Sequence, residues 1–430
     1  MEEFEKPTQR GDDEPIIHSN LLLNIKIWNP TESVNWKLPP SKSHIIRWLL
    51  LTSQGPKGEL FTISGTQGAG LDAISMLKAI SKIGVRIEKK YDELVVEAVG
   101  INGFRNPMQV INCENSGTTL RLLTIAVTRI GEPITLDGDQ TLRKRGSPKF
   151  WKELKEVGFR IKHGTDENIF PIVIQGPLIP GAVKLNVSKT SQHLSSLLLS
   201  MPAMDGDLQL DIAGELVSRE HAALSFELAK KCGSKNILGE KNLKPFNCKP
   251  PKNIVIPKDS SHISFAILFQ ILHGIEVIFP KIKNEDTIGS GIILGLNLQE
   301  YNEVNLRDAN DLITPLAAIM AIGGGGKITG AHHAQFKESA RITSTLKLLT
   351  NFGLKVVAHQ DGLEIQGEQI PIRPAKYVKT YGDHRCQMTA VILATKVGGK
   401  IEGAKLHQIS DPNFIANLTE IGVNIKNVRN

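Results

Sequence analysis

The sequence has few cysteines and few aromatic residues, and both shortages narrow the possible functions. Four cysteines occur in 430 residues, far apart and outside any CxxC or Cys/His cluster: Cys113, Cys232, Cys248 and Cys386. This spacing offers neither the ligands of a zinc site nor a disulfide framework, so we expect reduced thiols without a catalytic role. Aromatic residues make up 5% of the chain and are not interleaved with basic ones, which argues against a nucleic-acid-binding stripe.

Long hydrophobic runs are also missing. The longest apolar stretches, at 263–272 and 312–322, are too short to cross a bilayer as helices, so no membrane partner is expected. Residues 1–20 are polar, with acidic clusters and no basic or apolar targeting region; we expect a flexible tail on a cytoplasmic protein. The net charge of +7 fits nucleic acid and small anionic substrates equally well, and does not distinguish them.

What the chain does contain is a repeated unit. Its length favours two domains of about 200 residues each. A similar sequence pattern recurs at intervals of roughly seventy residues, with one shorter interval of about fifty. Each copy opens with small polar residues, enters an apolar helix-like run, and ends in a second helix before a β-like stretch. The six openings lie at 41–43, 115–118, 190–192, 259–261, 310–311 and 383–385.

A glycine closes the second helix of each copy, at the position where a helix C-cap favours positive φ. The closing glycines are Gly84, Gly158, Gly233, Gly295, Gly353 and Gly422. Three copies in each half predict two similar α/β domains. We expect the chain to cross between them near 38–40 and near 254–258. Residues 41–256 would then form one domain, and residues 21–40 with 257–430 the other.

The openings carry residues that suit anionic ligands. Ser, Thr, Asn and Asp cap helix N-termini, where free N–H groups and the positive end of the helix dipole attract anions. Charged or amide side chains stand within or beside the same openings: Lys42, Arg47, Arg121, Gln192, Asp311, His384 and Arg385. Several such helix ends facing one cleft would hold phosphates and carboxylates. The scattered His163, His193, His332, His359 and His407 are expected to be structural.

In the N-terminal half, the openings resemble motifs of the 5-enolpyruvylshikimate-3-phosphate (EPSP) synthase family. Residues 41–47 (SKSHIIR) are similar to the family's S-K-S-x-x-x-R segment, and residues 115–121 (NSGTTLR) to its N-A-G-T-x-x-R loop. Residues 139–145 resemble a segment with an anion-binding Arg, and 190–192 (TSQ) an S-S-Q motif. The resemblance implies substrate-binding roles for Lys42, Ser43, Arg47, Asn115, Gly117, Arg145, Thr190, Ser191, Gln192 and Ser218.

The C-terminal half continues the resemblance in the same order. Residues 308–312 (DANDL) look like the segment with the family's catalytic Asp, residues 337–341 (KESAR) like K-E-S-D-R, and residues 381–385 (YGDHR) like Y-x-D-H-R. The resemblance implies catalytic Asp311, Lys337, Glu338 and His384, and substrate-binding Arg341 and Arg385. It also implies an inside-out α/β barrel of three βαβαββ repeats in each domain, with helices inside and sheets outside.

The family's reaction moves the enolpyruvyl group of phosphoenolpyruvate to the 5-hydroxyl of shikimate 3-phosphate and releases phosphate by addition and elimination. Such chemistry needs an acid and a base, which a carboxylate beside an ammonium group can supply. Planar guanidinium groups suit the two anionic groups of phosphoenolpyruvate. These two substrates are the expected partners of a monomeric transferase without metal or cofactor.

Among the positions that depart from the family pattern, five leave alternatives open: His221, His333, Gln335, Ala340 and Ile409. His221 and His333 would alter the acceptor pocket, and Ile409 replaces a Lys, which predicts weaker phosphoenolpyruvate binding. A transferase with another acceptor and a non-catalytic homologue therefore remain alternatives. The related UDP-N-acetylglucosamine transferases usually carry a reactive Cys in the loop that here spans residues 139–148, and this chain has none there.

Overall fold

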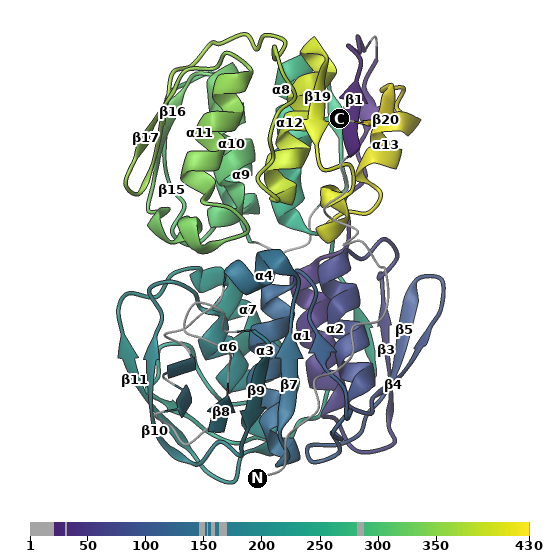
Figure 1. The fold of residues 1–430 in the computed structure, drawn as a ribbon, viewed down its shortest axis with the longest axis vertical. Coiled ribbons are helices and arrows are strands. Elements are labelled where there is room, and N and C mark those ends of the chain that lie inside the picture. The colour runs from purple at the N-terminus through teal and green to yellow at the C-terminus, as the bar shows by residue number, and fades with distance from the viewer. Residues whose placement is uncertain are drawn as a thin grey trace.

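The computed structural model describes residues 21–30, 32–145, 151–152, 154–155, 160–162, 170–281 and 288–429. The chain forms two bodies, one above the other along the long axis (Figure 1). In both bodies helices occupy the interior and sheets lie at the outside (Figure 1). The expected tail at residues 1–20 and the closing Gly158 lie outside the described residues.

The N-terminal body is the lower one in Figure 1. Its helices are α1 (Lys42–Ser53), α2 (Leu71–Lys82), α3 (Gly117–Val127), α4 (Gln140–Lys144), α6 (Gln192–Ser200) and α7 (Arg219–Lys231), with short η1 (Thr128–Ile130) and η2 (Met201–Ala203). Its strands are β3 (Leu60–Ser64), β4 (Arg86–Lys89), β5 (Glu93–Glu97), β6 (Ile111–Asn112), β7 (Ile134–Asp137), β8 (Arg160–Lys162), β9 (Ile172–Gln175), β10 (Gly181–Asn186), β11 (Leu208–Ala213), β12 (Asn242–Leu243) and β13 (Asn253–Val255). They pair in the orders β13-β3-β5-β4, β6-β7-β9-β8 and β10-β11-β12.

The C-terminal body is the upper one. Its helices are α8 (Ile263–His273), α9 (Ser290–Leu294), α10 (Ile313–Ile322), α11 (Arg341–Asn351), α12 (His384–Val397) and α13 (Phe414–Glu420), with short η3 (Ser260–His262), η4 (Asn310–Leu312), η5 (His332–Phe336) and η6 (Leu406–Ile409). Its strands are β1 (Leu21–Ile25), β2 (Val34–Asn35), β14 (Val277–Ile278), β15 (Asn302–Asn305), β16 (Gly326–Thr329), β17 (Val356–His359), β18 (Gly362–Ile365), β19 (Gly399–Glu402) and β20 (Ile425–Arg429). The orders are β15-β16-β18-β17, β19-β1-β20 and β14-β2.

The sheets repeat one pairing scheme. In β13-β3-β5-β4, β6-β7-β9-β8 and β15-β16-β18-β17, the first two strands are parallel and the remaining pairs antiparallel. The N-terminal strand β1 pairs with both β19 and β20 of the C-terminal body. The first segment of the chain therefore completes a sheet whose other strands lie near the C-terminus.

The first helix of each repeat forms the core. In the N-terminal body α1 contacts α3, α6 and α7, and in the C-terminal body α8, α10 and α12 contact one another. Their apolar residues are buried on nearly every side, as expected for helices that are hydrophobic all round. In the described part of the chain, no helix has the length and apolar character needed to span a membrane.

Two chain segments cross between the bodies side by side. The Ser41 N–H donates to the Pro257 carbonyl at 2.9 Å, and the Asp259 N–H donates to the Pro39 carbonyl at 2.8 Å. Pro40 and Lys258 form an antiparallel bridge between these hydrogen bonds. The crossing thus lies directly before two of the repeat openings, so both helix N-termini sit at the junction of the bodies.

Each of the six openings starts a helix at this junction. Ser116 caps α3, Asp259 caps η3 and Asp383 caps α12 through side-chain oxygens that accept backbone N–H groups. The expectation of positive φ at every closing glycine is wrong for Gly295, whose φ is −87°. Its N–H donates to the Gly291 carbonyl at 3.1 Å, so the short helix α9 ends with a further right-handed turn.

A second contact between the bodies, here called the clasp, joins residues 215–219 to residues 307–310. The Arg307 guanidinium forms an ion pair with Glu215 and donates to the Leu216 carbonyl at 3.2 and 3.1 Å. The Ser218 N–H donates to the Arg307 carbonyl at 3.0 Å. The clasp contains the proposed site residue Ser218 and ends directly before Asp311. It therefore links the relative position of the two bodies to the geometry of the proposed site.

A buried carboxyl group lies near the crossing. Asp411 follows η6, is 4% exposed, and accepts the Asn413 N–H at 3.0 Å. Burial raises the pKa of Asp411 to about 7, and the neighbouring Asp259 carboxylate adds to this rise. Asp411 is therefore protonated in weakly acidic solution and loses its proton near neutrality.

Replacing Arg307 by Ala should loosen the clasp. The hydrogen bonds to Leu216 are partly exposed, so we expect a loss of about 1 kcal/mol for the joined arrangement, or about a fivefold rise in separated forms. Small-angle scattering of the substrate-free protein should show a larger radius of gyration. Lys252→Ala breaks a pair with Glu59 within one body and serves as the control. Equal scattering for both variants would contradict a clasp between the bodies.

Asp411→Asn should stabilise the protein in a pH-dependent manner. Because the pKa of Asp411 is raised on folding, wild type loses stability as pH increases from about 4 to about 7, when the buried group must ionise. The variant should gain on the order of 3 kcal/mol in unfolding free energy at about pH 8 and almost nothing at about pH 4. Urea unfolding at both pH values measures this difference. The exposed control Asp207→Asn should show no such trend, and a pH-independent gain for Asp411→Asn would refute the explanation.

Candidate active site

A cleft lies between the two bodies where the helix N-termini meet. Its lining includes these residues proposed from the sequence: Lys42, Ser43, Gly117, Arg145, Thr190, Gln192, Asp311, Lys337, Glu338, Arg341 and His384. Residues from both bodies contribute, and they come from all but one of the repeats. The arrangement therefore brings one set of cationic, carboxylate and amide groups into a single space.

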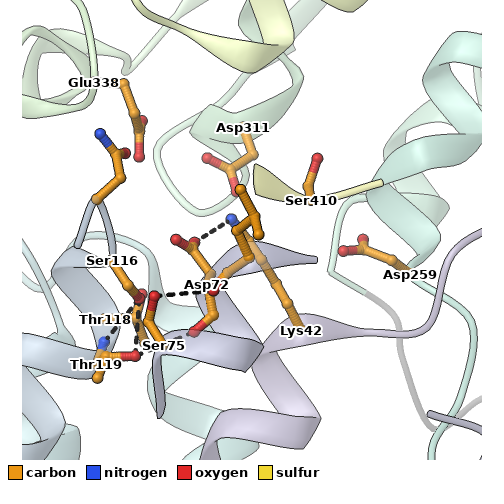
Figure 2. Close-up of polar contacts among 12 residues, drawn as sticks. Lys42, Asp72, Ser75, Ser116, Thr118, Thr119, Asp259, Asp311, Glu338 and Ser410 are labelled. Atoms are coloured by element: carbon orange, nitrogen blue, oxygen red, sulfur yellow. Dashed lines mark hydrogen bonds and ion pairs between the residues drawn. The ribbon is translucent and has the colours of Figure 1, made fainter. Parts of the chain in front are cut away.

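The N-terminal wall is built on the starts of α1, α2 and α3. Lys42 Nζ lies 2.8 Å from Asp72 Oδ2, and Ser116 at the start of α3 accepts the Thr119 N–H at 3.2 Å, as Figure 2 shows. Desolvation opposes the charge on Lys42, but Asp72, Glu338 and Asp311 outweigh it and raise the pKa of the ammonium group. Lys42 is thus a fixed positive charge.

The C-terminal wall is organised by Arg341, which is 1% exposed. Its NH1 lies 2.6 Å from Asp311 Oδ1, its NH2 2.8 Å from Glu338 Oε2, and its Nε 2.9 Å from Asp383 Oδ2. Arg385 NH2 approaches the second oxygen of Asp311 at 3.2 Å. Burial disfavours the charged carboxylates, but the guanidinium groups outweigh it and hold the pKa values of Asp311 and Glu338 well below their usual range.

Arg145 joins the two walls. Its NH1 lies 3.1 Å from Glu338 Oε1 in the opposite body, and its NH2 donates to Asn115 Oδ1 at 3.1 Å. In Figure 2, Asp311 and Glu338 extend from the C-terminal body toward Lys42 and Asp72. The Glu338 carboxylate therefore contacts guanidinium groups of both bodies, Arg145 from the N-terminal body and Arg341 from the C-terminal body.

Lys337 is the group best placed to exchange a proton. Its Nζ lies 4.0 Å from Asp311 Oδ1, and desolvation with the nearby Arg341 charge lowers the pKa of the ammonium group. Burial also lowers the pKa of His384 well below its usual value, with the positive charges of Lys42 and Arg385 adding to the effect. Lys337 can therefore act as an acid, whereas His384 is a neutral imidazole at pH 7.

The opposite side of the cleft is a network of amide, hydroxyl and imidazole groups. Gln192 Nε2 donates to Thr118 Oγ1 at 2.9 Å, and Asn310 Nδ2 donates to Ser218 Oγ at 3.2 Å and also contacts His333. Burial lowers the pKa of His221 to about 3 and that of His333 to about 4. The two imidazoles can therefore accept or donate hydrogen bonds without adding charge near neutral pH, whereas Arg121, which donates to Gln192 Oε1 at 2.7 Å, brings a positive charge to this side.

Other residues proposed from the sequence lie behind the cleft surface: Arg47, Asn115, Ser191, Ser218 and Arg385. Arg47 donates to Ser225 Oγ at 2.7 Å, to the Ser43 carbonyl at 2.9 Å and to the His221 carbonyl at 3.0 Å. Because its guanidinium nitrogens are engaged within the protein, Arg47 supports the wall and does not reach the cleft.

Several lining residues had no assigned role in the sequence analysis. Asp72 pairs with Lys42, but no spacing rule links an acid in the first turn of α2 to the start of α1. His193, expected to be structural, also lines the cleft, and its position directly after Gln192 is the sequence signal that could have marked it. Arg121, which stands beside the second opening in the sequence, lines the cleft as well.

The departures from the family pattern occupy different places. His221 and His333 line the cleft, whereas Gln335 and Ala340 line a neighbouring hollow. Ile409 is 1% exposed and packs with Leu406 outside the cleft lining. No charged side chain therefore reaches the cleft from position 409.

Comparisons of sequence agree with this geometry. A profile of EPSP synthase (3-phosphoshikimate 1-carboxyvinyltransferase) matches residues 32–294 and 280–418. The chain is 28% identical to the 3-phosphoshikimate 1-carboxyvinyltransferase of Methanothrix thermoacetophila, over 90% of this chain and 96% of that protein. It is 29% identical to the enzyme of the same name from Methanocella arvoryzae, with the same coverage of each chain.

Solved structures show the same fold. An EPSP synthase from Acinetobacter baumannii has a TM-score of 0.75 and 21% identity, over 95% of this chain and 100% of that one. The enolpyruvyl transferase NikO from Streptomyces tendae has a TM-score of 0.72 and 13% identity, over 95% and 99%. These likenesses confirm the predicted two-domain α/β fold. Because the family profile covers most of the sequence, the chain belongs to the EPSP synthase family.

Proposed function

We propose that the chain transfers the enolpyruvyl group of phosphoenolpyruvate to the 5-hydroxyl of shikimate 3-phosphate and releases phosphate. The observation that carries the proposal is the arrangement of charge in the cleft. Asp311 and Glu338 are held ionised beside Lys337, whose pKa is lowered, and guanidinium groups lie around them. A base, an acid and anion-binding groups therefore share one site, as addition and elimination require.

In the addition step, the acceptor hydroxyl oxygen bonds to C2 of phosphoenolpyruvate and C3 gains a proton. Asp311 takes the hydroxyl proton, since it is ionised and faces the cleft. Lys337 gives the proton to C3, because its lowered pKa makes it a stronger acid than Lys42. A tetrahedral intermediate results, with a methyl group at C3.

In the elimination step, the bond from C2 to the phosphate oxygen breaks and a proton leaves C3. Glu338 accepts that proton and passes it back to Lys337, and the proton held by Asp311 leaves with phosphate. Arg145 and Arg341 each contact Glu338, so they keep its carboxylate oriented while their positive charge favours anionic ligands. His384 contributes a neutral hydrogen-bonding group beside the reacting atoms.

The acceptor is assigned to the side of Thr190 and Gln192, with Ser218 behind the cleft surface, where polar groups and helix N-termini meet. A second candidate is transfer to another phosphorylated alcohol. It is favoured by His221 and His333, which place neutral imidazoles at this side of the cleft. We further propose a monomeric enzyme that acts in the cytoplasm.

Asp311→Asn should abolish most of the activity. The amide keeps the shape of the side chain but cannot accept the hydroxyl proton, so kcat should fall by about 10²- to 10⁴-fold. Release of phosphate from phosphoenolpyruvate and shikimate 3-phosphate measures the effect, with thermal melting to check folding. Glu303→Gln, an exposed change on the strand leading to the site, should retain wild-type kcat. Undiminished turnover by Asp311→Asn would remove this residue from the mechanism.

The dependence of kcat on pH should reflect the ionisation of the Lys337 ammonium group. Transfer requires its ammonium form, so kcat should fall as pH rises through a pKa below the ordinary value of 10.5. His221 and His333 are already neutral, so kcat should be flat between about pH 6 and pH 8. Lys337→Arg should lower kcat and shift the alkaline decline upward, whereas the exposed Lys405→Arg should change neither. An unshifted decline in Lys337→Arg would assign it to another group.

A further inference from the structure

Two of the four cysteines lie next to each other in the N-terminal body, although they are far apart in the sequence. Cys232 ends α7, and Cys248 lies in the segment between β12 and β13. Cys232 is 0% exposed and Cys248 is 1% exposed. Their spacing in the sequence matches no cysteine motif, so the fold alone brings these two thiols together.

The backbone holds the two segments side by side. The Lys249 N–H donates to the Cys232 carbonyl at 2.9 Å. A Cβ atom placed on Gly233 would lie 3.1 Å from the Asn247 carbonyl oxygen, so the two chains are also close at the next position. Residues opposite each other across such a contact have Cα atoms about 5 Å apart, which is within the range that disulfides span.

The two thiol groups face each other at the edge of the core. The hydrogen bond to the Cys248 side chain, together with burial, raises the pKa of the Cys232 thiol. Cys248 Sγ donates to the Leu51 carbonyl near the end of α1 at 3.4 Å. Lys231 and Lys249, which adjoin the cysteines in the sequence, are exposed. The pair therefore lies one residue beneath the surface.

We propose that Cys232 and Cys248 are a disulfide-forming pair, which a small-molecule disulfide oxidises to an intramolecular bond across residues 233–247. The pair lies apart from the proposed active site. Ser218 stands at the start of α7 and Cys232 at its end, and a helix of this length separates them by about 20 Å. Neither cysteine lines the cleft.

The oxidation consists of two exchange steps, with oxidised glutathione as the oxidant. One cysteine thiolate attacks a sulfur of the reagent, which forms a mixed disulfide and releases one glutathione. The second cysteine thiolate then attacks the sulfur of the first cysteine, and the second glutathione leaves. The protein loses two protons and two electrons, and the two released glutathione molecules carry them. Burial makes the thiolate scarce in the folded protein, so the bond should form faster during refolding.

The bond would fasten a lysine-rich surface segment to the core. Residues 233–247 include the exposed Lys235, Lys241 and Lys244. Their strand β12 pairs with β11 through the register Leu208 to Leu243 and Gln209 to Asn242. A disulfide that closes a loop of about 15 residues restricts the unfolded chain and thereby stabilises the folded one. The oxidised protein should therefore resist unfolding better than the reduced protein.

The test refolds the full chain from urea in a mixture of reduced and oxidised glutathione at about pH 8, where thiolates form readily. Free thiols are then alkylated, and mass spectrometry with peptide mapping counts them and locates any bond. Cys232→Ala and Cys248→Ala each remove one member of the pair. Cys113→Ala is the matched control, because Cys113 follows β6 in the same body and is equally buried.

Wild type should retain two of its four thiols, with Cys232 joined to Cys248. The control Cys113→Ala should form the same bond, whereas the other two variants should form none. Oxidised wild type should melt roughly 5 to 10 °C above the form reduced with dithiothreitol. This difference should vanish in Cys232→Ala and Cys248→Ala. Phosphate release by the two forms should agree within about twofold, because the bond is remote from the cleft.

Three results would overturn the proposal. The first is four free thiols in refolded wild type, and the second is a bond that involves Cys113, Cys386 or a second copy of the chain. The third is equal melting temperatures for the oxidised and reduced forms, since the bond would then not fasten the segment. Neither the bond nor the melting shift requires transferase activity, so failure of the proposed function leaves this test intact.

Discussion

The cleft depends on the ion pairs that the buried Arg341 guanidinium forms with Asp311, Glu338 and Asp383. Guanidinium groups keep two of these carboxylates ionised, although burial alone would favour their protonated forms: Arg385 and Arg341 act on Asp311, and Arg341 and Arg145 act on Glu338. Asp383 caps α12, and Asp311 lies in the turn that leads into α10. Arg341 therefore contributes to the charge state of the proposed reacting groups and also links two helix N-termini to each other.

Charge in the cleft links the two bodies as well. Glu338 belongs to the C-terminal body but shares its oxygens between Arg341 and Arg145, and Arg145 belongs to the N-terminal body. The crossing segments and the clasp hold the same two bodies together through neutral and charged hydrogen bonds. The geometry of the proposed site is thus a property of the junction, and neither body contains it alone.

The repeats explain why a junction of this kind exists. Each repeat begins a buried helix with a small or polar residue, and the crossing segments place these helix starts at the same level. Polar N-termini cannot be buried in the apolar core without partners, so they face the space between the bodies. Buried hydrophobic helices therefore deliver polar N-termini to one place, where anionic ligands can satisfy them.

The sequence by itself determined the two-domain α/β architecture and the six helix starts, because capping residues and apolar periodicity are local signals. Most of the proposed cleft residues, among them Arg145, Lys337 and Glu338, came from the resemblance of the sequence to the EPSP synthase family. Tertiary structure alone decided which charges meet. It paired Lys42 with Asp72, directed the Arg47 side chain into the cleft wall and left Ile409 outside the cleft. It also ended α9 at Gly295 without positive φ. Ion pairs and burial depend on the positions of groups far apart in the chain, and no spacing rule records those positions.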